Sequence, residues 1–497
     1  METKAQGRSR LIVVSNRLPV AFRREPSGEW TAQPGSGGLV TALRPVLQNR
    51  GGRWIGWSGV VEEELADPRA VLARSAERFG YELVPVSLTA AERDGFYHGF
   101  SNEVIWPLFH DLLSMCRFHP SYWHAYEAVN RKFAKETAAG AQPEDFIWVH
   151  DYHLMGMAGE LRRLGVSSRI AFFLHIPFPP LDIFLKLPWR FPILRSLLEF
   201  DLVGFQTIRD RRNFLQCARL LLPEASITGK GAVVRVRWEG REVRVGTFPI
   251  SIDARSYSRL ARRADVIEKT ESLKQDEGAR QIVLGIDRLD YTKGIPQKLE
   301  AFRWMLQKDP EQRGKVTLVQ VAVPSREDIP GYREHRAAIE GLVGEINGQF
   351  TRSGWVPIHY IHRSLEGPRL PAYYLAADVA LVTPLKDGMN LVAKEYCATR
   401  LADDGVLVLS EFAGAAAELQ TGALLVNPYD VEGVADTLRR ALAMPEEEKK
   451  ARMRRLRRIV RERDIYHWLD AYLRAAISRD LSEFPRAEDY LPAALAS

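Results

Sequence analysis

The sequence predicts an α/β protein built from two Rossmann-like, doubly wound parallel-sheet domains. Short apolar runs of strand length alternate with helical patterns through most of the chain, which is typical of parallel sheets with helices on both faces. The chain has 497 residues, of which 46% are hydrophobic, and single hydrophobic cores stop growing near about 250 to 300 residues. We therefore expect two cores and two domains.

The strand-like runs fall into two groups. The first group lies at 11–15, 146–150, 170–175 and 202–205, and the second at 282–286, 316–322, 379–383, 406–410 and 423–427. Runs of this length that are rich in Val, Ile, Leu and Phe indicate buried parallel strands. We place the boundary near Pro249, so the domains span 8–249 and 250–464. A helical segment at 465–482 and a loose tail at 483–497, with prolines and small residues, complete the chain.

Composition favours a soluble, cytoplasmic protein without a membrane anchor. No apolar run of about 18 residues occurs, and the first ten residues lack the charged-then-apolar pattern of a secretory leader. Cys116, Cys217 and Cys397 are odd in number and far apart, which argues against a disulfide framework or a zinc site and fits a reducing compartment. We interpret all three as packing residues.

The net charge of +6 raises the question of nucleic acid, and the densest basic run is 449–463. Met453, Leu456, Ile459 and Val460 interrupt this run at helical spacing. The pattern therefore predicts an amphipathic helix with a solvated basic face, in preference to a nucleic-acid arm. A modest positive field would also help to attract phosphorylated substrates.

The run DGMNLVAKEY, which starts at Asp387, is the most informative motif in the chain. It follows a strand that ends near Thr383, and Asn390 is the expected N-cap of the next helix. Free backbone N–H groups at such a helix start attract phosphate, Gly388 allows close approach of a ligand, and Glu395 lies one turn further in, where it can meet a ribose diol. The motif predicts a sugar-nucleotide site; the alternative is an ordinary turn with solvated acids.

A second loop, Asp287 to Gly294, follows another apolar strand and carries Arg288 and Lys293. Arg offers a planar fork and Lys a point charge, so the pair suits a diphosphate leaving group. The alternative is a surface salt-bridge loop. Open α/β sheets bind ligands at the carboxyl ends of their strands, and both loops lie there, which favours the ligand site.

In the first half, Arg17 follows the first strand, and the loop from Gly35 to Gly38 precedes a helix at Leu39. Together they offer a cation and bare backbone amides. This loop lies beyond the first strand-to-helix turn and lacks the G-x-G-x-x-G spacing, so a nicotinamide-linked dehydrogenase is disfavoured.

Aromatic and histidine residues supply further candidates. Tyr97 and Trp106 lie nine residues apart beside polar groups, and their spacing alone favours the core over a sugar site. Asp151 and His175 both follow strands. His150 and His153 raise the question of a metal, but no carboxylate or thiolate set completes a site, so we expect no metal ligands.

These motifs belong to a longer ordered series. Its members are SNRLP at Ser15, GSGGLVTAL at Gly35, WIGWSG at Trp54, FYHGFSNEVIWPLFH at Phe96, VHDYHL at Val149, FFLHIPFPP at Phe172, RLDYTKG at Arg288 and DGMNLVAKEY at Asp387. From about Arg10 to about Ala475 the chain resembles the trehalose-6-phosphate synthase family of retaining glycosyltransferases. The resemblance implies the GT-B fold, with two domains facing a central cleft and the helix at 465–482 crossing back to the N-terminal domain.

The resemblance also implies roles for individual residues. The N-terminal domain would bind the acceptor and the C-terminal domain the nucleotide sugar. Acceptor-binding residues would be Arg17 and Arg326 on the 6-phosphate, Tyr97 and Trp106 around the phosphate and ring, and Asp151 on hydroxyl groups. Donor-binding residues would be Gly37, Gly38, His175, Arg288, Lys293, Leu365 in the base-reading loop 361–366, Asp387, Gly388, Met389, Asn390, Leu391 and Glu395.

The implied reaction transfers glucose from a nucleoside diphosphate to glucose 6-phosphate and yields α,α-trehalose 6-phosphate. Catalytic candidates are Asp151, His175, Arg288, Lys293 and Asp387; no metal or other cofactor is expected, because the helix dipole and the cations take the leaving diphosphate's charge. Family resemblance favours front-face transfer over a double displacement through Asp151. UDP-glucose is the default donor, with ADP- and GDP-glucose left open.

Other functions stay open at this stage. The acceptor could instead be glycerol 3-phosphate, giving glucosylglycerol phosphate, or the chain could be a catalytically silent sugar-phosphate sensor. A phosphatase function is disfavoured because no D-x-D-x-T motif occurs, so a separate trehalose-phosphate phosphatase would complete the pathway. The expected partners are small molecules, without nucleic acid or membrane, and the sequence leaves open whether the chain forms a homo-oligomer.

Overall fold

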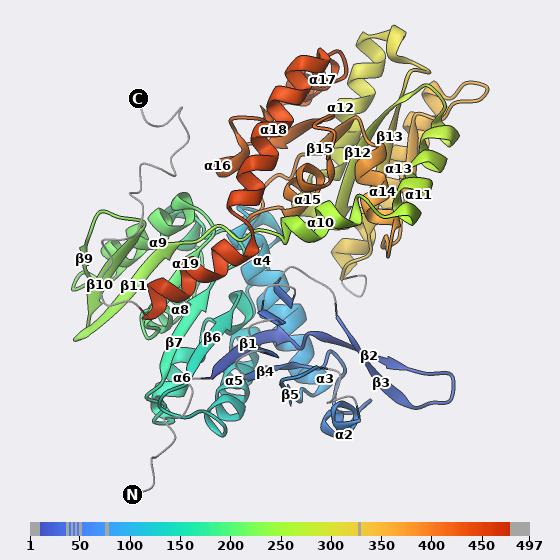
Figure 1. The fold of residues 1–497 in the computed structure, drawn as a ribbon. Helices are drawn as coiled ribbons and strands as arrows, with labels where there is room; N and C mark the ends of the chain where they lie inside the picture. Colours follow the sequence, from blue (N-terminus) through green and yellow to red (C-terminus); the bar gives the residue numbers. More distant parts are fainter. Residues whose placement is uncertain are drawn as a thin grey trace, which may run out of the picture. The chain divides into compact units, whose positions relative to one another are not determined.

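The computed structural model describes residues 10–35, 39–40, 43–44, 47–48, 52–74, 79–326 and 330–477. The chain forms two compact units, and each is described by itself (Figure 1). The first contains the chain up to Pro249 and the segment from Leu469, and the second runs from Ile250 to Trp468. Both units have a largely parallel sheet with helices, which confirms the predicted α/β class.

Within the described part of the first unit, nine strands form one sheet in the order β5-β4-β1-β6-β7-β8-β11-β10-β9. The strands are β1 (Leu11–Arg17), β4 (Gly52–Trp57), β5 (Glu82–Val86), β6 (Phe146–His150), β7 (Arg169–Phe173), β8 (Leu202–Phe205), β9 (Ser226–Thr228), β10 (Val233–Trp238) and β11 (Arg241–Thr247). A separate hairpin pairs β2 (Val20–Arg24) with β3 (Trp30–Pro34).

One edge of this largely parallel sheet is antiparallel, which was not predicted from the sequence. Strand β10 pairs antiparallel with both β11 and β9, whereas β11 pairs parallel with β8. Only two residues, Glu239 and Gly240, separate β10 from β11, and both have positive φ. A connection this short can join antiparallel strands but cannot make the crossover that parallel strands need.

Helices connect and cover the strands of the first unit. They are α2 (Pro68–Ala73), α3 (Ala90–Glu92), α4 (Trp106–Phe109), α5 (Pro120–Ala138), α6 (Met157–Arg163), α7 (Leu181–Phe184), α8 (Arg190–Leu197) and α9 (Ile208–Leu221), with the π-helix η2 (Arg93–Ile105) and the 3-10 helices η3 (Leu113–Met115) and η4 (Tyr152–Leu154). The predicted candidate Tyr97 lies on η2, a rare helix type that occurs often at functional sites.

The described residues of the second unit form a six-stranded, fully parallel sheet in the order β14-β13-β12-β15-β16-β17. Its strands are β12 (Gln281–Arg288), β13 (Val316–Val323), β14 (Ile358–Ile361), β15 (Val379–Val382), β16 (Val406–Ser410) and β17 (Leu424–Val426). Its helices are α10 (Ala254–Leu260), α11 (Ala264–Glu277), η5 (Tyr291–Lys293), α12 (Ile295–Lys308), η6 (Pro310–Gln312), α13 (Pro330–Phe350), α14 (Arg369–Ala376), α15 (Leu391–Thr399), α16 (Ala416–Leu419), α17 (Val431–Leu442) and α18 (Glu446–Glu462).

The last described helix, α19 (Ile465–Ile477), joins the second unit to the end of the first. Tyr472 stacks on Trp148 of β6, with ring centroids 4.3 Å apart, and donates a hydrogen bond to the carbonyl oxygen of Phe172 at 2.8 Å. Arg169 and Arg244 donate to the carbonyl oxygens of Ala476 and Ala475. Cations at a helix C-terminus satisfy its free carbonyls and its dipole, so these arginines fix the end of α19.

Two further expectations can be compared with the structure. Helix α18 buries Met453, Leu456 and Val460 and is otherwise strongly basic, as the amphipathic pattern predicted. Cys217 and Cys397 are buried and Cys116 is half-buried, and burial raises the pKa of each thiol to about 12, which fits packing residues. Among the described helices, none is long and apolar enough to cross a membrane.

Candidate active site

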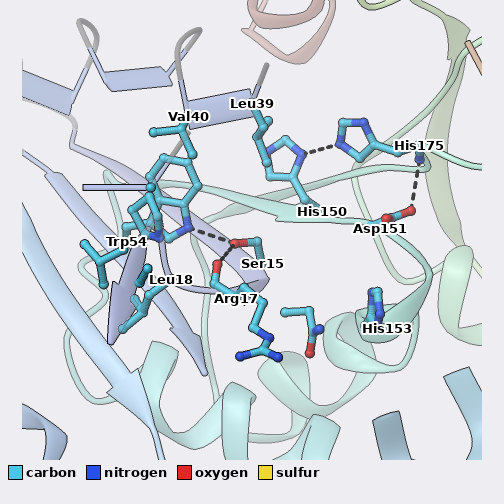
Figure 2. A pocket seen from close by; sticks show the side chains of 15 residues that line it. Ser15, Arg17, Leu18, Leu39, Val40, Trp54, His150, Asp151, His153 and His175 are labelled. Atoms are coloured by element: carbon cyan, nitrogen blue, oxygen red, sulfur yellow. Dashed lines mark hydrogen bonds between the residues drawn. The ribbon is translucent and has the colours of Figure 1, made fainter. Parts of the chain in front are cut away.

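A cavity of about 600 Å³ opens at the ends of β1 and β6 in the first unit (Figure 2). Parallel strands expose their last residues at one edge of the sheet, so side chains that follow different strands meet there. The lining includes Ser15, Asn16, Arg17, Leu18, Pro19, Trp54, His150, Asp151, His153 and His175. The structure thus brings together three of the predicted site residues, Arg17, Asp151 and His175.

Arg17 is held at the cavity by the turn that follows the core of β1. The hydroxyl of Ser15 donates to the carbonyl oxygen of Arg17 at 2.7 Å and accepts a hydrogen bond from Trp54 Nε1 at 2.8 Å (Figure 2). The guanidinium carbon lies 4.2 Å from the ring centroid of Trp57 and 5.7 Å from that of Tyr97. Stacking of this kind and a hydrogen bond with the Tyr97 side chain orient the guanidinium, and its further N–H donors can bind an anion.

Asp151 occupies an unusual backbone conformation, with φ 73° and ψ 167°. Its backbone N–H donates to the carbonyl oxygen of Phe173 at 2.8 Å, and its Oδ1 accepts from the backbone N–H of His175 at 3.2 Å (Figure 2). A non-glycine residue in this region costs about 1–3 kcal/mol and persists where the surroundings enforce it. The strained backbone holds the carboxylate at the cavity, beside the loop that follows β7.

His150 and His175 form a contact that sequence reasoning missed. Nδ1 of His150 lies 3.1 Å from Nε2 of His175. Burial lowers the pKa of His175 to about 3, and burial together with His175 lowers the pKa of His150 well below its usual range. Both rings are therefore neutral near pH 7, and neutral imidazoles can exchange hydrogen bonds with sugar hydroxyls.

The structure separates the two aromatic candidates. Tyr97 stacks on His153, with centroids 5.9 Å apart, and is a neighbour of Arg17. Trp106 is 4% exposed, and its ring centroid lies 4.3 Å from that of His110. Neither Tyr97 nor Trp106 is part of the cavity lining, but Tyr97 contacts two residues that are, Arg17 and His153. The acceptor role of Trp106 stays a prediction, and its present surroundings are those of a core residue.

In the second unit, Lys293 and Asp387 form an ion pair of 2.5 Å between Nζ and Oδ2, with side chains 8% and 15% exposed. Asn390 also donates to Asp387 Oδ2, at 3.2 Å, and accepts from the backbone N–H of Ala393 as the N-cap of α15. The predicted N-cap is thus confirmed. Arg288 ends β12 and is exposed, so a cation, an ion pair and a helix start are supplied by two adjacent strand ends.

Asp290 organises these cations, and sequence reasoning had assigned it no role. It is fully buried, and its Oδ1 accepts from the backbone N–H and the hydroxyl of Thr292. Burial opposes its charge, but the positive charges of Arg326, Arg288 and Lys293 lower its pKa below the usual range. One buried carboxylate thus faces the three cations predicted to bind phosphate groups.

Arg326 is more constrained than a surface phosphate ligand would be. Its φ is 52°, its side chain is 7% exposed, and its Nη1 lies 3.1 Å from Asp290 Oδ2 and 2.5 Å from the hydroxyl of Tyr332. Removing this guanidinium would leave a buried carboxylate short of a partner. The acceptor role of Arg326 stays a prediction, and its contacts with Asp290 and Tyr332 show a structural role.

Glu395 lies in α15 and accepts a hydrogen bond from the hydroxyl of Tyr374 at 2.7 Å. Tyr257 of α10 also hydrogen-bonds to this carboxyl group. Burial raises the pKa of Glu395 above its usual range, and the two tyrosines only partly offset that effect. The predicted ribose ligand is therefore a carboxyl group that takes up a proton at a higher pH than an ordinary glutamate does.

The structure shows the surroundings of some of the remaining donor candidates and leaves others outside the described residues. Met389 is buried, Leu391 is the first residue of α15, and Leu365 is half-buried in the loop between β14 and α14. Gly37 and Gly38 lie outside the described residues. Among residues that the structure describes, no group of three or more His, Cys, Asp or Glu side chains could hold a metal ion.

Gly414 supports the donor loop from a distant part of the chain. The backbone N–H of Gly414 donates to the carbonyl oxygen of Asp387 at 3.1 Å, and that of Ala415 donates to the carbonyl oxygen of Met389 at 2.8 Å. A Cβ atom added at Gly414 would lie 1.9 Å from the carbonyl oxygen of Gly388. Real Cβ atoms do not approach an oxygen so closely, so the loop requires glycine at this position.

We expect Gly414→Ala to displace the loop from Asp387 to Asn390, to destabilise the protein by about 1–3 kcal/mol and to weaken binding of a nucleotide sugar, the ligand predicted for this loop. Gly341→Ala is the matched control, because nothing lies within 4 Å of its added Cβ and it sits in a helix, where Ala is favoured by about 0.5–1 kcal/mol. Thermal unfolding and donor titration measure both effects. Equal donor affinity in the two variants would contradict the bracing role.

Comparison with known proteins gives a consistent picture. Residues 9–477 match the family model described as glycosyltransferase family 20. Trehalose-6-phosphate synthase from Mycobacterium avium (strain 104) is 45% identical over 481 residues, which cover 95% of this chain and 96% of that protein.

Solved structures of similar proteins include an alpha,alpha-trehalose-phosphate synthase (UDP-forming) from Burkholderia xenovorans in complex with glucose-6-phosphate. Its TM-score is 0.84 and its identity to this chain is 36%, and the match covers 94% of this chain and 100% of that chain. An E. coli structure bound with UDP-2-fluoro glucose has a TM-score of 0.85 and 37% identity, and covers 96% of this chain and all of its own. A structure of trehalose-6-phosphate synthase used to study glycosyltransfer with retention has a TM-score of 0.83 and 37% identity, and covers 94% of this chain and 99% of its own.

Proposed function

Because the chain belongs to glycosyltransferase family 20, we propose that it transfers glucose from UDP-glucose to glucose 6-phosphate with retention, giving α,α-trehalose 6-phosphate and UDP. The observation that carries this function is that each unit holds a candidate site suited to one of the two ligands bound in structures of relatives. One unit has the guanidinium of Arg17 at a cavity, paired with none of the described carboxylates, which suits a sugar phosphate. The other has the Lys293–Asp387 pair at a helix start, which suits a nucleotide sugar.

The donor residues divide the work of bond cleavage. As the bond between glucose C1 and the β-phosphate oxygen breaks, its electron pair passes to the diphosphate, and the sugar acquires oxocarbenium character. Arg288, Lys293 and the N–H groups at the start of α15 stabilise that negative charge. Asp387, already held by Lys293 and Asn390, orients the sugar hydroxyls, and neutral His175 contacts the same sugar.

The acceptor residues bring the nucleophile. Arg17 binds the 6-phosphate, and Asp151 holds hydroxyl groups near the reacting carbon. In the front-face route, the anomeric oxygen of the acceptor bonds to C1 as its proton moves to the departing phosphate oxygen, so no protein nucleophile is needed. Double displacement through Asp151 is the competing route. We favour the first on the grounds of family resemblance.

An activity matrix tests the proposed function directly. UDP-, ADP- and GDP-glucose are each combined with glucose 6-phosphate and with glycerol 3-phosphate, and the products are identified by anomeric configuration. We expect turnover with UDP-glucose and glucose 6-phosphate, giving an α,α-linked product. Preference for glycerol 3-phosphate would establish the alternative acceptor, and absence of turnover with every pair would favour a silent sensor.

We expect excess chelator to leave most activity in place. The diphosphate charge is taken up by Arg288, Lys293 and a helix N-terminus, so the proposed step needs no divalent ion. The measurement is turnover before and after chelation, with the chelator then removed. Complete loss that one stoichiometric metal restores would assign His150 and His153 to a metal site instead.

We expect the donor KM to rise as pH falls through the raised pKa of Glu395. The ionised carboxylate accepts hydrogen bonds from both ribose hydroxyls, whereas the protonated form donates one and accepts less well, so affinity decreases by about tenfold. Titration of UDP across the acid range measures this effect. Glu395→Gln should bind weakly and without that pH dependence; an unchanged profile in the variant would remove Glu395 from the ribose site.

The proposed partners are small molecules, a nucleotide sugar and a sugar phosphate. Since the product keeps its phosphate, we propose that a separate phosphatase releases trehalose. A cytoplasmic location fits the free, unreactive cysteines.

A further inference from the structure

Two adjoining cavities in the second unit, of about 430 and 280 Å³, are lined mainly by arginines from α10, the residues just after it, and α18. Arg255, Arg259 and Arg262 contribute from the first segment, and Arg454, Arg457, Arg458 and Arg461 from α18. Within the described residues of this lining, the only carboxylates are Asp403 and Glu462. Positive charge is therefore concentrated in a hollow, away from the candidate catalytic residues.

The arginines of α18 and of the cavity lining differ in whether they form an ion pair with a carboxylate. Arg452 pairs with Glu448 at 2.8 Å, and Arg455 donates to the carbonyl oxygen of Thr421 at 2.7 Å. Inside the cavities, Asp403 pairs with Arg454 at 3.1 Å and with Arg457. In contrast, none of the described carboxylates forms an ion pair with Arg255, Arg262, Arg458 or Arg461.

The arrangement is unfavourable without a counter-charge. Like charges one helical turn apart destabilise a helix by about 0.2–0.5 kcal/mol per pair, and Arg255 with Arg259, Arg454 with Arg458, and Arg457 with Arg461 have this spacing. Guanidinium groups that converge from two helices present several planar forks, the geometry that binds phosphate bidentately. The excess of arginines over carboxylates matches a ligand with more than one phosphate group.

We propose that this arginine cavity is a binding site for a small anion that carries two or more phosphate groups, and that its occupancy acts on the donor site. A nucleic acid is the other class of polyanion, but it needs an extended basic track, whereas these arginines line a hollow of small-molecule size. Sugar bisphosphates and nucleoside triphosphates share the required chemistry.

Two elements connect the cavity with the donor residues. Helix α10 carries Arg255 and Arg259 and also Tyr257, which hydrogen-bonds to Glu395. Helix α15 starts at the donor loop, and Leu401 and Asp403, which follow its end, line the cavities. An anion that fixes α10 would hold Tyr257 on Glu395 and prepare the carboxyl group for ribose. This coupling rests on the proposed donor role of Glu395, whereas anion binding does not.

Calorimetric titration with inorganic tripolyphosphate tests the binding. The enzyme is first saturated with UDP and glucose 6-phosphate, so that the substrate sites are filled. We expect one equivalent to bind, orthophosphate to bind far more weakly, and Arg255→Gln and Arg461→Gln each to reduce the affinity about tenfold. Arg455→Gln is the matched control, because it removes the same charge from α18 outside the cavity.

Several results would overturn the proposal. These are no binding to the saturated enzyme, an equal loss in Arg455→Gln, or an oligonucleotide that binds through Arg255 and Arg461 where tripolyphosphate does not. Titration with a hexose bisphosphate and with ATP, compared side by side, then distinguishes the two sources of the anion.

The coupling has its own measurement. Tripolyphosphate should raise UDP affinity about fivefold in the unmodified chain and leave it unchanged in the Arg255→Gln/Arg461→Gln double variant. Tyr257→Phe should still bind tripolyphosphate but lose the increase in UDP affinity. A rise in UDP affinity that persists in the double variant would show that the effect does not arise at the arginine cavity and would overturn the coupling, as would an unchanged UDP affinity in the unmodified chain.

Discussion

Replacing Lys293 with Ala is expected to lower turnover about a hundredfold or more, the range seen when one preorganised group that stabilises transition-state charge is removed. The loss has two physical origins. The departing diphosphate loses a cation, and Asp387 loses the partner that holds it 2.5 Å away. Arg288→Ala should give a loss of the same order, since it removes the second cation while leaving Asp387 in place. Steady-state kinetics with saturating substrates measure both.

Lys308→Ala is the matched control for Lys293. Lys308 also pairs with a carboxylate, Glu432, in the same unit, but both side chains are about half exposed, and surface ion pairs contribute little to stability. Its turnover should stay normal. Circular dichroism should show that the Lys293 variant is folded. If Lys293→Ala turned over normally and only bound the donor more weakly, its assignment to the leaving group would be wrong.

Arg17→Ala is expected to raise the KM for glucose 6-phosphate about tenfold to a hundredfold, which corresponds to a charge-assisted contact of about 1.5–3 kcal/mol. Within the described residues, no carboxylate pairs with Arg17, so the substitution leaves no buried charge behind. The measurement is separate titration of the variant with glucose 6-phosphate and with UDP. UDP affinity should change little.

Arg23→Ala on the neighbouring strand β2 removes an exposed arginine outside the cavity and should alter neither affinity. Lost UDP affinity together with retained glucose 6-phosphate affinity in Arg17→Ala would reverse the assignment of acceptor and donor to the two halves of the chain. Arg326 is a less suitable target, because its removal also disturbs buried Asp290.

Much of the fold could be predicted because parallel strands are buried on both faces and read as continuous apolar runs. All the strand-like runs that defined the two groups are strands in the structure. The antiparallel edge was missed although β10 alternates, with Val234 and Val236 buried and Arg235 and Arg237 less so. That period of two is the signal of a strand with one solvated face, and it distinguishes β10 from the parallel runs.

The candidate site was predictable where a single strand end carried the signal. Asn390 as an N-cap follows from local chemistry. Contacts between distant segments could not be predicted in this way. The approach of Gly414 to Gly388 and the hydrogen bond from Tyr257 to Glu395 join residues far apart in sequence, and no local pattern encodes them. Asp290 was within the RLDYTKG motif, but only the fold shows that it faces Arg326.

The positive φ angles of Asp151, Arg326 and Asn390 determine how these positions should be mutated. Alanine would remove the functional group but keep the Cβ, so the cost of about 1–2 kcal/mol that left-handed backbone imposes on a residue with a Cβ is common to the native and alanine side chains. Glycine tolerates the conformation. The difference between the glycine and alanine variants at one position therefore measures the backbone strain, and the alanine variant alone reports the chemistry of the lost functional group.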